Sequence, residues 1–133
     1  MYYFAYGFYL NKKIMLESCP ESKPMVRDSL PNYKLIITGW SRLWRGGMVS
    51  IRSFRGEKVP GVVYEISDRD LNRLDKYRGY PRDYNRLNVT VFDEDGESIK
   101  AVTYIKTGQS EEAQPSREYL AIIQQGYRDW VIV

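Results

Sequence analysis

The first eleven residues constrain the fold more than any other part of the chain. Residues 2–6 form a run of mostly aromatic side chains, which favours a packed β-strand. Gly7 interrupts this run, and a glycine allows a turn or a close backbone approach that a Cβ would block. A helix-like segment follows directly. Strand, glycine turn and helix together leave backbone N–H groups free to bind an anion, although the same pattern also forms ordinary strand-to-helix connections.

Short strands and helices are predicted along the rest of the chain. Asn11 is expected to cap a helix over residues 12–18, and Ser67 is expected to cap a second one that Gly79 ends. A third helix is expected from residues 115–116 to about residue 127, with residues 130–133 folding back onto the body. Turns are expected at residues 45–47, 56–57 and 93–96. The predicted strands are residues 24–29, 33–40, 48–51, 59–66, 84–92 and 98–106.

The apolar stripe of the second helix is expected to contain Leu71, Leu74 and Tyr77. Six or so short strands with two or three helices between them indicate an α+β protein with a strongly bent or closed sheet. A chain of 133 residues is expected to form one domain over residues 1–133.

Composition excludes several classes of function. The chain has no histidine, which removes Ser-His-Asp catalysis and nearly all zinc sites, so no metal or cofactor is expected. Cys19 is the only cysteine and is expected to pack rather than react. The net charge of +3 is scattered along the chain, which argues against nucleic-acid binding. Any chemistry must therefore use carboxylates, tyrosines, lysine or backbone groups.

Localisation and stability are also suggested by the composition. No apolar run approaches the roughly 20 residues that span a bilayer, so no membrane interaction is expected. The N-terminus lacks the features of a signal peptide, and we expect a cytoplasmic protein. The absence of histidine and the interspersed Arg, Lys and Glu residues fit a thermostable protein.

Two motifs become specific when they occur together. The first is Tyr6-Gly7-x-x-Leu10, and the second is the sequence LDKYRGYP at residues 74–81. With Gly46-Gly47 and the sequence GVVYEI at residues 61–66, they resemble the γ-glutamylcyclotransferase family, also called AIG2-like, over essentially the whole chain. The resemblance implies a small mixed closed β-barrel with two to three flanking helices. It also implies an enzyme that releases 5-oxoproline from γ-glutamyl compounds.

The resemblance implies a ligand-binding loop whose backbone N–H groups hold the substrate carboxylate. This loop corresponds to Tyr6, Gly7, Phe8, Tyr9 and Leu10. The family loop typically reads Tyr-Gly-Ser-Asn-Leu, so Phe8 and Tyr9 place two bulky rings where a hydroxyl and an amide are common. Tyr84 and Tyr119 match positions where family members often have tyrosines near the pocket, although such aromatics are more often ordinary core residues.

Arg78 is the more serious departure from the family pattern. The motif Leu-Asp-x-Tyr-Glu-Gly has a glutamate at this position, and in the family that glutamate is the general acid and base. Such catalysis contributes about 10²–10⁴-fold in rate. Arginine stays protonated and cannot supply it, so little or no cyclotransferase activity is expected. Asp75 and Glu65 are the two carboxylates that could substitute, and Arg78 is also explained as a cation at a helix C-terminus.

A cluster of substituted positions suggests binding in place of catalysis. Phe8, Tyr9, Met48, Val49 and Arg78 are predicted to gather at the mouth of the former active site. Aromatic residues, Met and Arg are enriched at protein interfaces, so these five are interpreted as a binding patch for a protein partner.

The leading interpretation is a γ-glutamylcyclotransferase-fold protein that has lost catalysis and binds a partner at this mouth, as in a binder engineered on the scaffold. A natural pseudoenzyme that binds a γ-glutamyl small molecule remains open. So does an active cyclotransferase that uses a displaced carboxylate.

Overall fold

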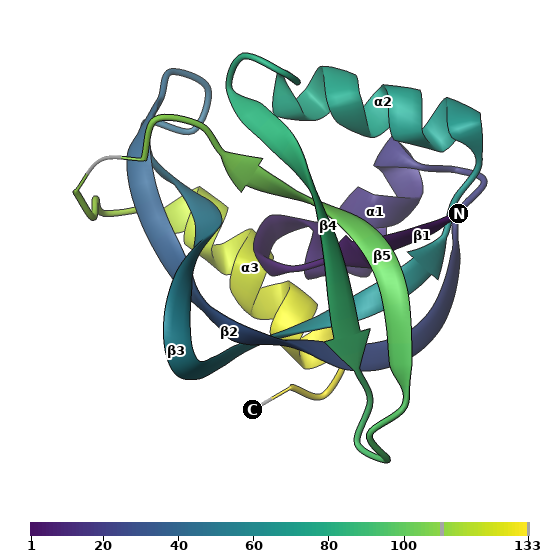
Figure 1. The fold of residues 1–133 in the computed structure, drawn as a ribbon. Coiled ribbons are helices and arrows are strands. Elements are labelled where there is room, and N and C mark those ends of the chain that lie inside the picture. The colour runs from purple at the N-terminus through teal and green to yellow at the C-terminus, as the bar shows by residue number, and fades with distance from the viewer. Residues whose placement is uncertain (110, 133) are drawn as a thin grey trace.

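Five strands form a closed barrel in the computed structural model, which describes residues 1–109 and 111–132 (Figure 1). The barrel closes in the order β1, β3, β2, β4, β5, and then back to β1. β1 runs parallel to β5 and the other pairs are antiparallel, so the barrel is mixed. The strands are β1 (Tyr2–Ala5), β2 (Lys23–Ser41), β3 (Gly46–Glu65), β4 (Tyr84–Phe92) and β5 (Ser98–Lys106).

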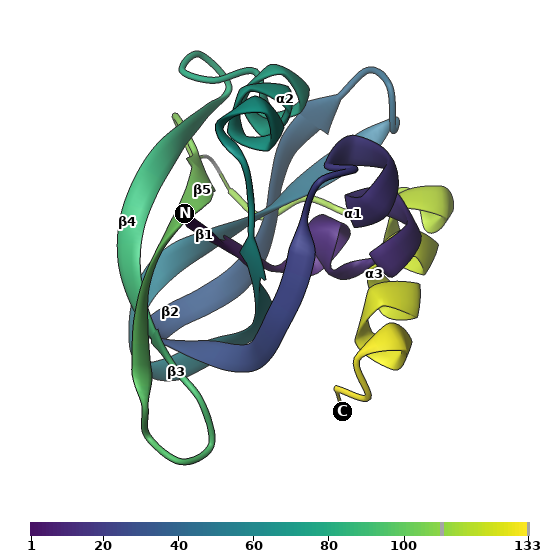
Figure 2. The ribbon, with the colours of Figure 1, turned by 90° about the vertical axis from the view of Figure 1, so that its right-hand side faces the viewer.

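Helices cover one side and one end of this barrel. The helices are the 3₁₀ turn η1 (Gly7–Leu10), α1 (Lys12–Ser18), α2 (Asp68–Arg78) and α3 (Arg117–Asp129). In Figure 2, α1 and α3 lie beside the barrel while α2 lies across one end. The predicted caps Asn11 and Ser67 are confirmed, because each side chain accepts a bond from the backbone of its helix. The side chain of Ser116, at the predicted start of α3, does the same. Gly79 ends α2 in the left-handed conformation, with φ of 63°.

The strands differ from the prediction in length. Residues 24–29 and 33–40 belong to one strand, β2, and residues 48–51 and 59–66 belong largely to β3. The predicted turn at residues 56–57 is wrong, because β3 passes through it with an irregularity in its pairing with β2. There Asn32 takes a positive φ of 63° and its Oδ1 accepts a bond from the Gly56 amide at 3.2 Å. Long bent strands replace pairs of short ones because each must curve around the closed barrel.

Side-chain burial agrees with most of the predicted pattern. Leu71 and Leu74 of α2 are buried, but Tyr77 is 61 % exposed and does not belong to the apolar stripe. Cys19 is fully buried, as expected, and burial raises the pKa of its thiol to about 12. Trp130 folds back and donates from Nε1 to the Leu10 carbonyl at 2.9 Å. Residue 133 of the predicted C-terminal segment lies outside the described residues.

None of the described helices is both long and apolar enough to cross a membrane. The predicted α+β fold with a small mixed closed barrel and flanking helices is confirmed. The carboxyl end of α2, the η1 turn and the β2–β3 turn frame one end of the barrel, where the two sequence motifs meet (Figures 1 and 2).

Candidate functional site

The η1 turn has the backbone that the sequence predicts. Gly7 takes a φ of 60°, which L-amino acids rarely adopt. A Cβ at this position would also lie 2.8 Å from Val49 Cγ2, so a side chain would collide with β3. The requirement for glycine at position 7 is therefore confirmed on both grounds, while its role in binding a carboxylate stays a prediction.

Arg78 lies inside a cluster of tyrosine rings. Its residue surface is only 3 % exposed, although it ends a helix at the edge of the barrel. The guanidinium carbon is 4.4 Å from the ring centroid of Tyr84 and 4.7 Å from that of Tyr9. Tyr104 and Tyr6 are 5.9 and 6.0 Å away. Faces of aromatic rings attract cations, so the rings solvate the guanidinium in place of water.

The charge of Arg78 is not neutralised by its surroundings. No ion pair joins it to a carboxylate of the described residues, and its Nε and Nη2 lack hydrogen-bond partners there. Burial raises the pKa of Tyr6 and Tyr84, more than the Arg78 charge lowers it, so both remain neutral phenols at neutral pH. The hydroxyl of Tyr3 is also buried, and it has no hydrogen-bond partner among the residues that the structure describes. The cluster thus contains a buried cation, and the unused hydrogen-bond donors are Nε and Nη2 of Arg78 and the hydroxyl of Tyr3.

The two carboxylates considered as substitutes lie in different surroundings. Asp75 forms an ion pair with Arg86, which raises the pKa of Arg86, and it accepts a bond from the Tyr104 hydroxyl at 2.5 Å. Glu65 is exposed at the end of β3, where it is the register partner of Tyr2 and Lys23. Asp75 is therefore adjacent to the tyrosine cluster through Tyr104, whereas Glu65 lies at the end of β3.

Tyr84 and Tyr119 hold the backbone of Val49 from two sides. The Tyr84 hydroxyl donates to the Val49 carbonyl at 2.7 Å, and the Val49 amide donates to the Tyr119 oxygen at 3.0 Å. Both tyrosines are buried. Their hydroxyls consequently position the strand beneath η1, which is a structural role at the heart of the site.

The five residues interpreted as a binding patch are brought together, but they do not form an exposed surface. Tyr9 and Val49 are buried like Arg78, and only Phe8 and Met48 are half-buried. Phe8 stacks on Tyr119 with ring centroids 5.2 Å apart. The interpretation as a surface patch fails because the substituted side chains pack inward and fill this end of the barrel instead of widening its mouth.

Three residues of the site were missed in the sequence. Tyr3 and Tyr104 belong to the tyrosine cluster, and Trp44 packs against Phe8 with ring centroids 5.5 Å apart. Alternate residues of a strand share a face, so Tyr104 lies on the same face of β5 as Val102. This period of two is a usable signal. Nothing local marks Trp44, because it follows the end of β2 in a turn.

No group of three or more His, Cys, Asp or Glu residues in the described part of the chain is arranged to hold a metal ion. What the site offers chemically is a buried cation, neutral phenols and one ion-paired carboxylate at its edge.

Comparison with known proteins identifies the family of this chain. Residues 3–129 match the model of the family described as "Gamma-glutamyl cyclotransferase, AIG2-like". Human γ-glutamylcyclotransferase is 32 % identical over 96 % of this chain and 70 % of its own length, and the bovine protein is 31 % identical over the same shares. The chain belongs to the γ-glutamylcyclotransferase, AIG2-like family.

Solved structures agree with this assignment. A structure titled γ-glutamyl cyclotransferase superposes with a TM-score of 0.90 at 30 % identity, covering 97 % of this chain and 79 % of the other. YkqA from Bacillus subtilis superposes with a TM-score of 0.81 at 24 % identity, covering 96 % of this chain and 48 % of the other, which shows the shared fold.

Proposed function

We propose that this family member does not catalyse cyclotransfer and instead binds a small carboxylate at the Arg78 end of the barrel. The observation that carries the proposal is the buried, unneutralised guanidinium of Arg78 with its free Nε and Nη2. The family resemblance assigns a glutamate to this position. A cation there repels a substrate ammonium and cannot accept its proton, so the cyclisation loses its acid–base group.

The same cation favours an anionic ligand. Arginine pairs with carboxylates through two parallel hydrogen bonds, and Arg78 has the donors available for them. The free hydroxyl of Tyr3 supplies a further donor. Because Arg78 is buried, a ligand must displace a covering side chain, and half-buried Phe8 packs over the cluster. The concentration of substitutions at Phe8, Tyr9 and Arg78 is a further support for binding, whether selection or design produced it.

Release of 5-oxoproline from a γ-glutamyl amine tests the loss of catalysis. The unmodified chain is expected to show no turnover above background, and the variant Phe8→Ser/Tyr9→Asn/Arg78→Glu is expected to gain at least about 10²-fold. Lys76→Glu is the matched control, because it makes the same charge change at an exposed position of α2. If the unmodified chain releases 5-oxoproline above background and as fast as the triple variant, Arg78 does not prevent catalysis.

Thermal unfolding with 5-oxoproline tests the binding. This carboxylate is expected to raise the unfolding temperature, while 2-pyrrolidinone, which lacks the carboxylate, is not. Arg78→Met is expected to abolish the effect. A shift that is the same with both compounds contradicts the proposal.

A protein partner at the same end would have to use residues other than the buried members of the predicted patch. Leu43, in the turn between β2 and β3, and Tyr77, in the last turn of α2, are 81 % and 61 % exposed. Such a partner would give no response to 5-oxoproline, and its binding would be lost in Leu43→Asp. We favour the small carboxylate because its oxygens would accept hydrogen bonds from the unused donors of Arg78 and Tyr3.

An active cyclotransferase is the second candidate, and the position of Asp75 favours it. Asp75 lies one helical turn before Arg78 and contacts the tyrosine cluster through Tyr104. If Asp75 is the base, the unmodified chain releases 5-oxoproline and Asp75→Asn abolishes this release, while the exposed control Asp68→Asn keeps it. Turnover that survives in Asp75→Asn and in Glu65→Gln would exclude both displaced carboxylates.

A further inference from the structure

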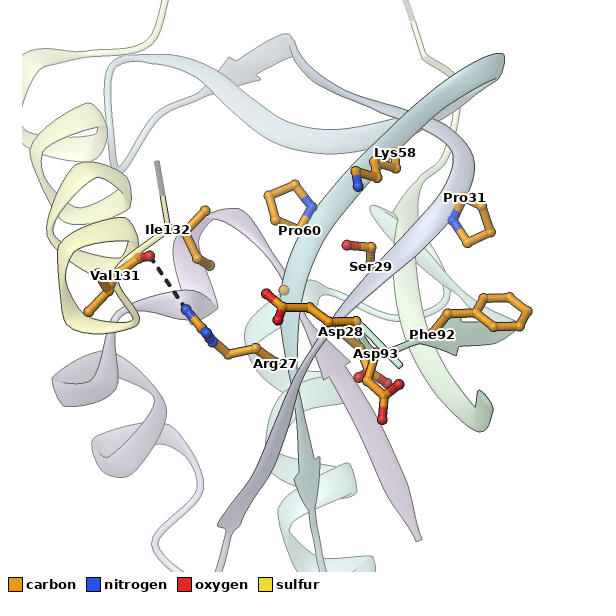
Figure 3. Close-up of a pocket in the computed structure, with 12 residues that line it drawn as sticks. Arg27, Asp28, Ser29, Pro31, Lys58, Pro60, Phe92, Asp93, Val131 and Ile132 are labelled. Atoms are coloured by element: carbon orange, nitrogen blue, oxygen red, sulfur yellow. Dashed lines mark hydrogen bonds between the residues drawn. The ribbon is translucent and has the colours of Figure 1, made fainter. Parts of the chain in front are cut away.

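A pocket lies at the other end of the barrel from Arg78. Its volume is about 680 Å³, and β2, β3, the turn after β4 and the C-terminal segment all contribute to its lining. Figure 3 shows Asp28 near its centre, with Arg27 and Asp93 on either side. Its walls include the apolar side chains of Pro31, Pro60, Phe92 and Ile132. No residue of the γ-glutamylcyclotransferase motifs named above, apart from Gly61, belongs to it.

Asp28 is a buried carboxylate without a partner. Its residue surface is 4 % exposed, and neither Oδ1 nor Oδ2 has a hydrogen-bond partner among the described residues. The residue paired with it on β3 is Gly61, which places no side chain opposite. A buried carboxylate normally has hydrogen bonds or a counter-ion, because transfer of an unpaired charge out of water is costly. Asp28 therefore has its full accepting capacity available to the pocket.

The neighbouring charges do not neutralise Asp28. Arg27, on the same strand, donates instead to the carbonyl of Trp130 at 3.0 Å. It also donates to the carbonyl of Val131 at 3.4 Å (Figure 3). Lys58 of β3 lines the pocket with an exposed side chain and forms no ion pair with Asp28.

Two further acids face the pocket from the turn after β4. They are Asp93 and Glu94, and Asp93 Oδ1 is already occupied by the amides of Asp95 and Glu97. Burial, with a smaller contribution from Asp93, raises the pKa of Asp28 to about 6. None of these neighbours supplies a counter-charge to the ionised carboxylate of Asp28.

We propose that this pocket binds a primary ammonium ion carried on an apolar body. The ammonium group has three donors, which suit the two free oxygens of Asp28, and the apolar body fits the proline, phenylalanine and isoleucine side chains of the wall. An anion is disfavoured by three acidic side chains. The described residues hold no group of three or more His, Cys, Asp or Glu that could bind a metal ion, which leaves an organic cation.

Thermal unfolding and calorimetry with n-hexylamine test this proposal at pH 8. Hexylamine is expected to raise the unfolding temperature of the unmodified chain, whereas 1-hexanol, which has the same body without the charge, is not. Asp28→Asn should bind hexylamine roughly tenfold to hundredfold more weakly, as expected for loss of a charged hydrogen bond. Asp95→Asn is the matched control. Asp95 is an exposed acid of the turn after β4, and it does not line the pocket.

The proton balance gives a readout that a structural role of Asp28 would not produce. Near pH 6 the free carboxyl is partly protonated, so binding of an ammonium ion must release protons. Calorimetry in two buffers of different ionisation enthalpy should detect this release in the unmodified chain and not in Asp28→Asn. Equal affinity for hexylamine and hexanol, or unchanged affinity in Asp28→Asn, overturns the proposal. Because hexanol is compared on the unmodified chain, the test does not depend on how well the variant folds.

Discussion

Arg78 and Asp28 are buried charges of opposite sign near opposite ends of β4, and their surroundings differ in kind. Arg78 lies next to Tyr84, the first residue of β4, and four tyrosine rings surround it. Asp28 lies beside Phe92, the last residue, where Ser29 is the register partner of Phe92 and a pocket of about 680 Å³ opens. The first charge is stabilised by ring faces inside a filled barrel end. The second has space for a ligand but no such compensation.

This difference predicts how each end responds to change. The filled end should be sensitive to loss of volume and tolerant of loss of charge. At the open end, volume should matter little and the charge should control both stability and binding.

Truncation at the two ends of β4 should give the largest contrast. Tyr84→Ala is expected to destabilise the protein by about 3–5 kcal/mol, because it removes a buried ring and leaves the Val49 carbonyl without its donor. Phe92→Ala, at a partly exposed residue, is expected to cost about 1 kcal/mol or less. Chemical denaturation measures both values. Similar losses would show that the two ends are packed alike.

Removal of the buried cation should increase stability. Arg78→Met replaces an unneutralised charge with an apolar side chain of similar length and is expected to stabilise the fold by about 1–4 kcal/mol. The measurement belongs in a buffer without carboxylate or phosphate, since a bound anion would stabilise the unmodified chain. A strongly destabilised Arg78→Met would mean that the tyrosine rings hold the guanidinium favourably and that no ligand is required.

The pH dependence of stability should isolate Asp28. Its pKa is raised from 3.8 to about 6, so the folded state holds this proton more tightly than the unfolded state. Its contribution is therefore fully present below about pH 4 and is lost as the pH rises through about 6. The increase of about two in pKa sets an upper limit of about 3 kcal/mol, which solvent screening reduces.

Asp28→Asn should remove this dependence. The variant is expected to gain stability relative to the unmodified chain as the pH rises from 4 to 7, as followed by denaturation at each pH. Asp95→Asn serves as the control and should show a constant difference. If the difference in unfolding free energy between Asp28→Asn and the unmodified chain also stays constant with pH, the Asp28 carboxylate is exposed to water.

The smallest effect is expected where an ion pair borders the tyrosine cluster. Arg86→Gln breaks the pair with Asp75, and Arg86 is partly exposed, so a loss of about 0.3–1 kcal/mol is expected. The loss should shrink at high salt. A loss above about 3 kcal/mol, or one that salt does not change, would indicate that Asp75 is buried more deeply at this end than its ion pair suggests.

The sequence by itself determined the local elements and the family. Capping residues at Asn11, Ser67 and Ser116 set the starts of three helices, because a side-chain oxygen there satisfies a free backbone N–H regardless of what packs later. Residues 84–92 and 98–106 were predicted as strands with the observed bounds, because the turn residues between them are local signals as well. The need for glycine at position 7 followed from the same kind of local reasoning.

Tertiary structure decided what is buried and what is joined. Residues 56–57 look like a turn, yet the closed barrel carries β3 past them as one long strand, because closure satisfies backbone groups that a hairpin would leave at an edge. Phe8, Tyr9 and Arg78 read as surface residues near one another. The structure brings them together but turns Tyr9 and Arg78 inward, since α2 and η1 pack over the same barrel end. Asp28 gave no signal at all, because only the meeting of β2, β3 and the turn after β4 leaves its carboxylate buried and unpaired.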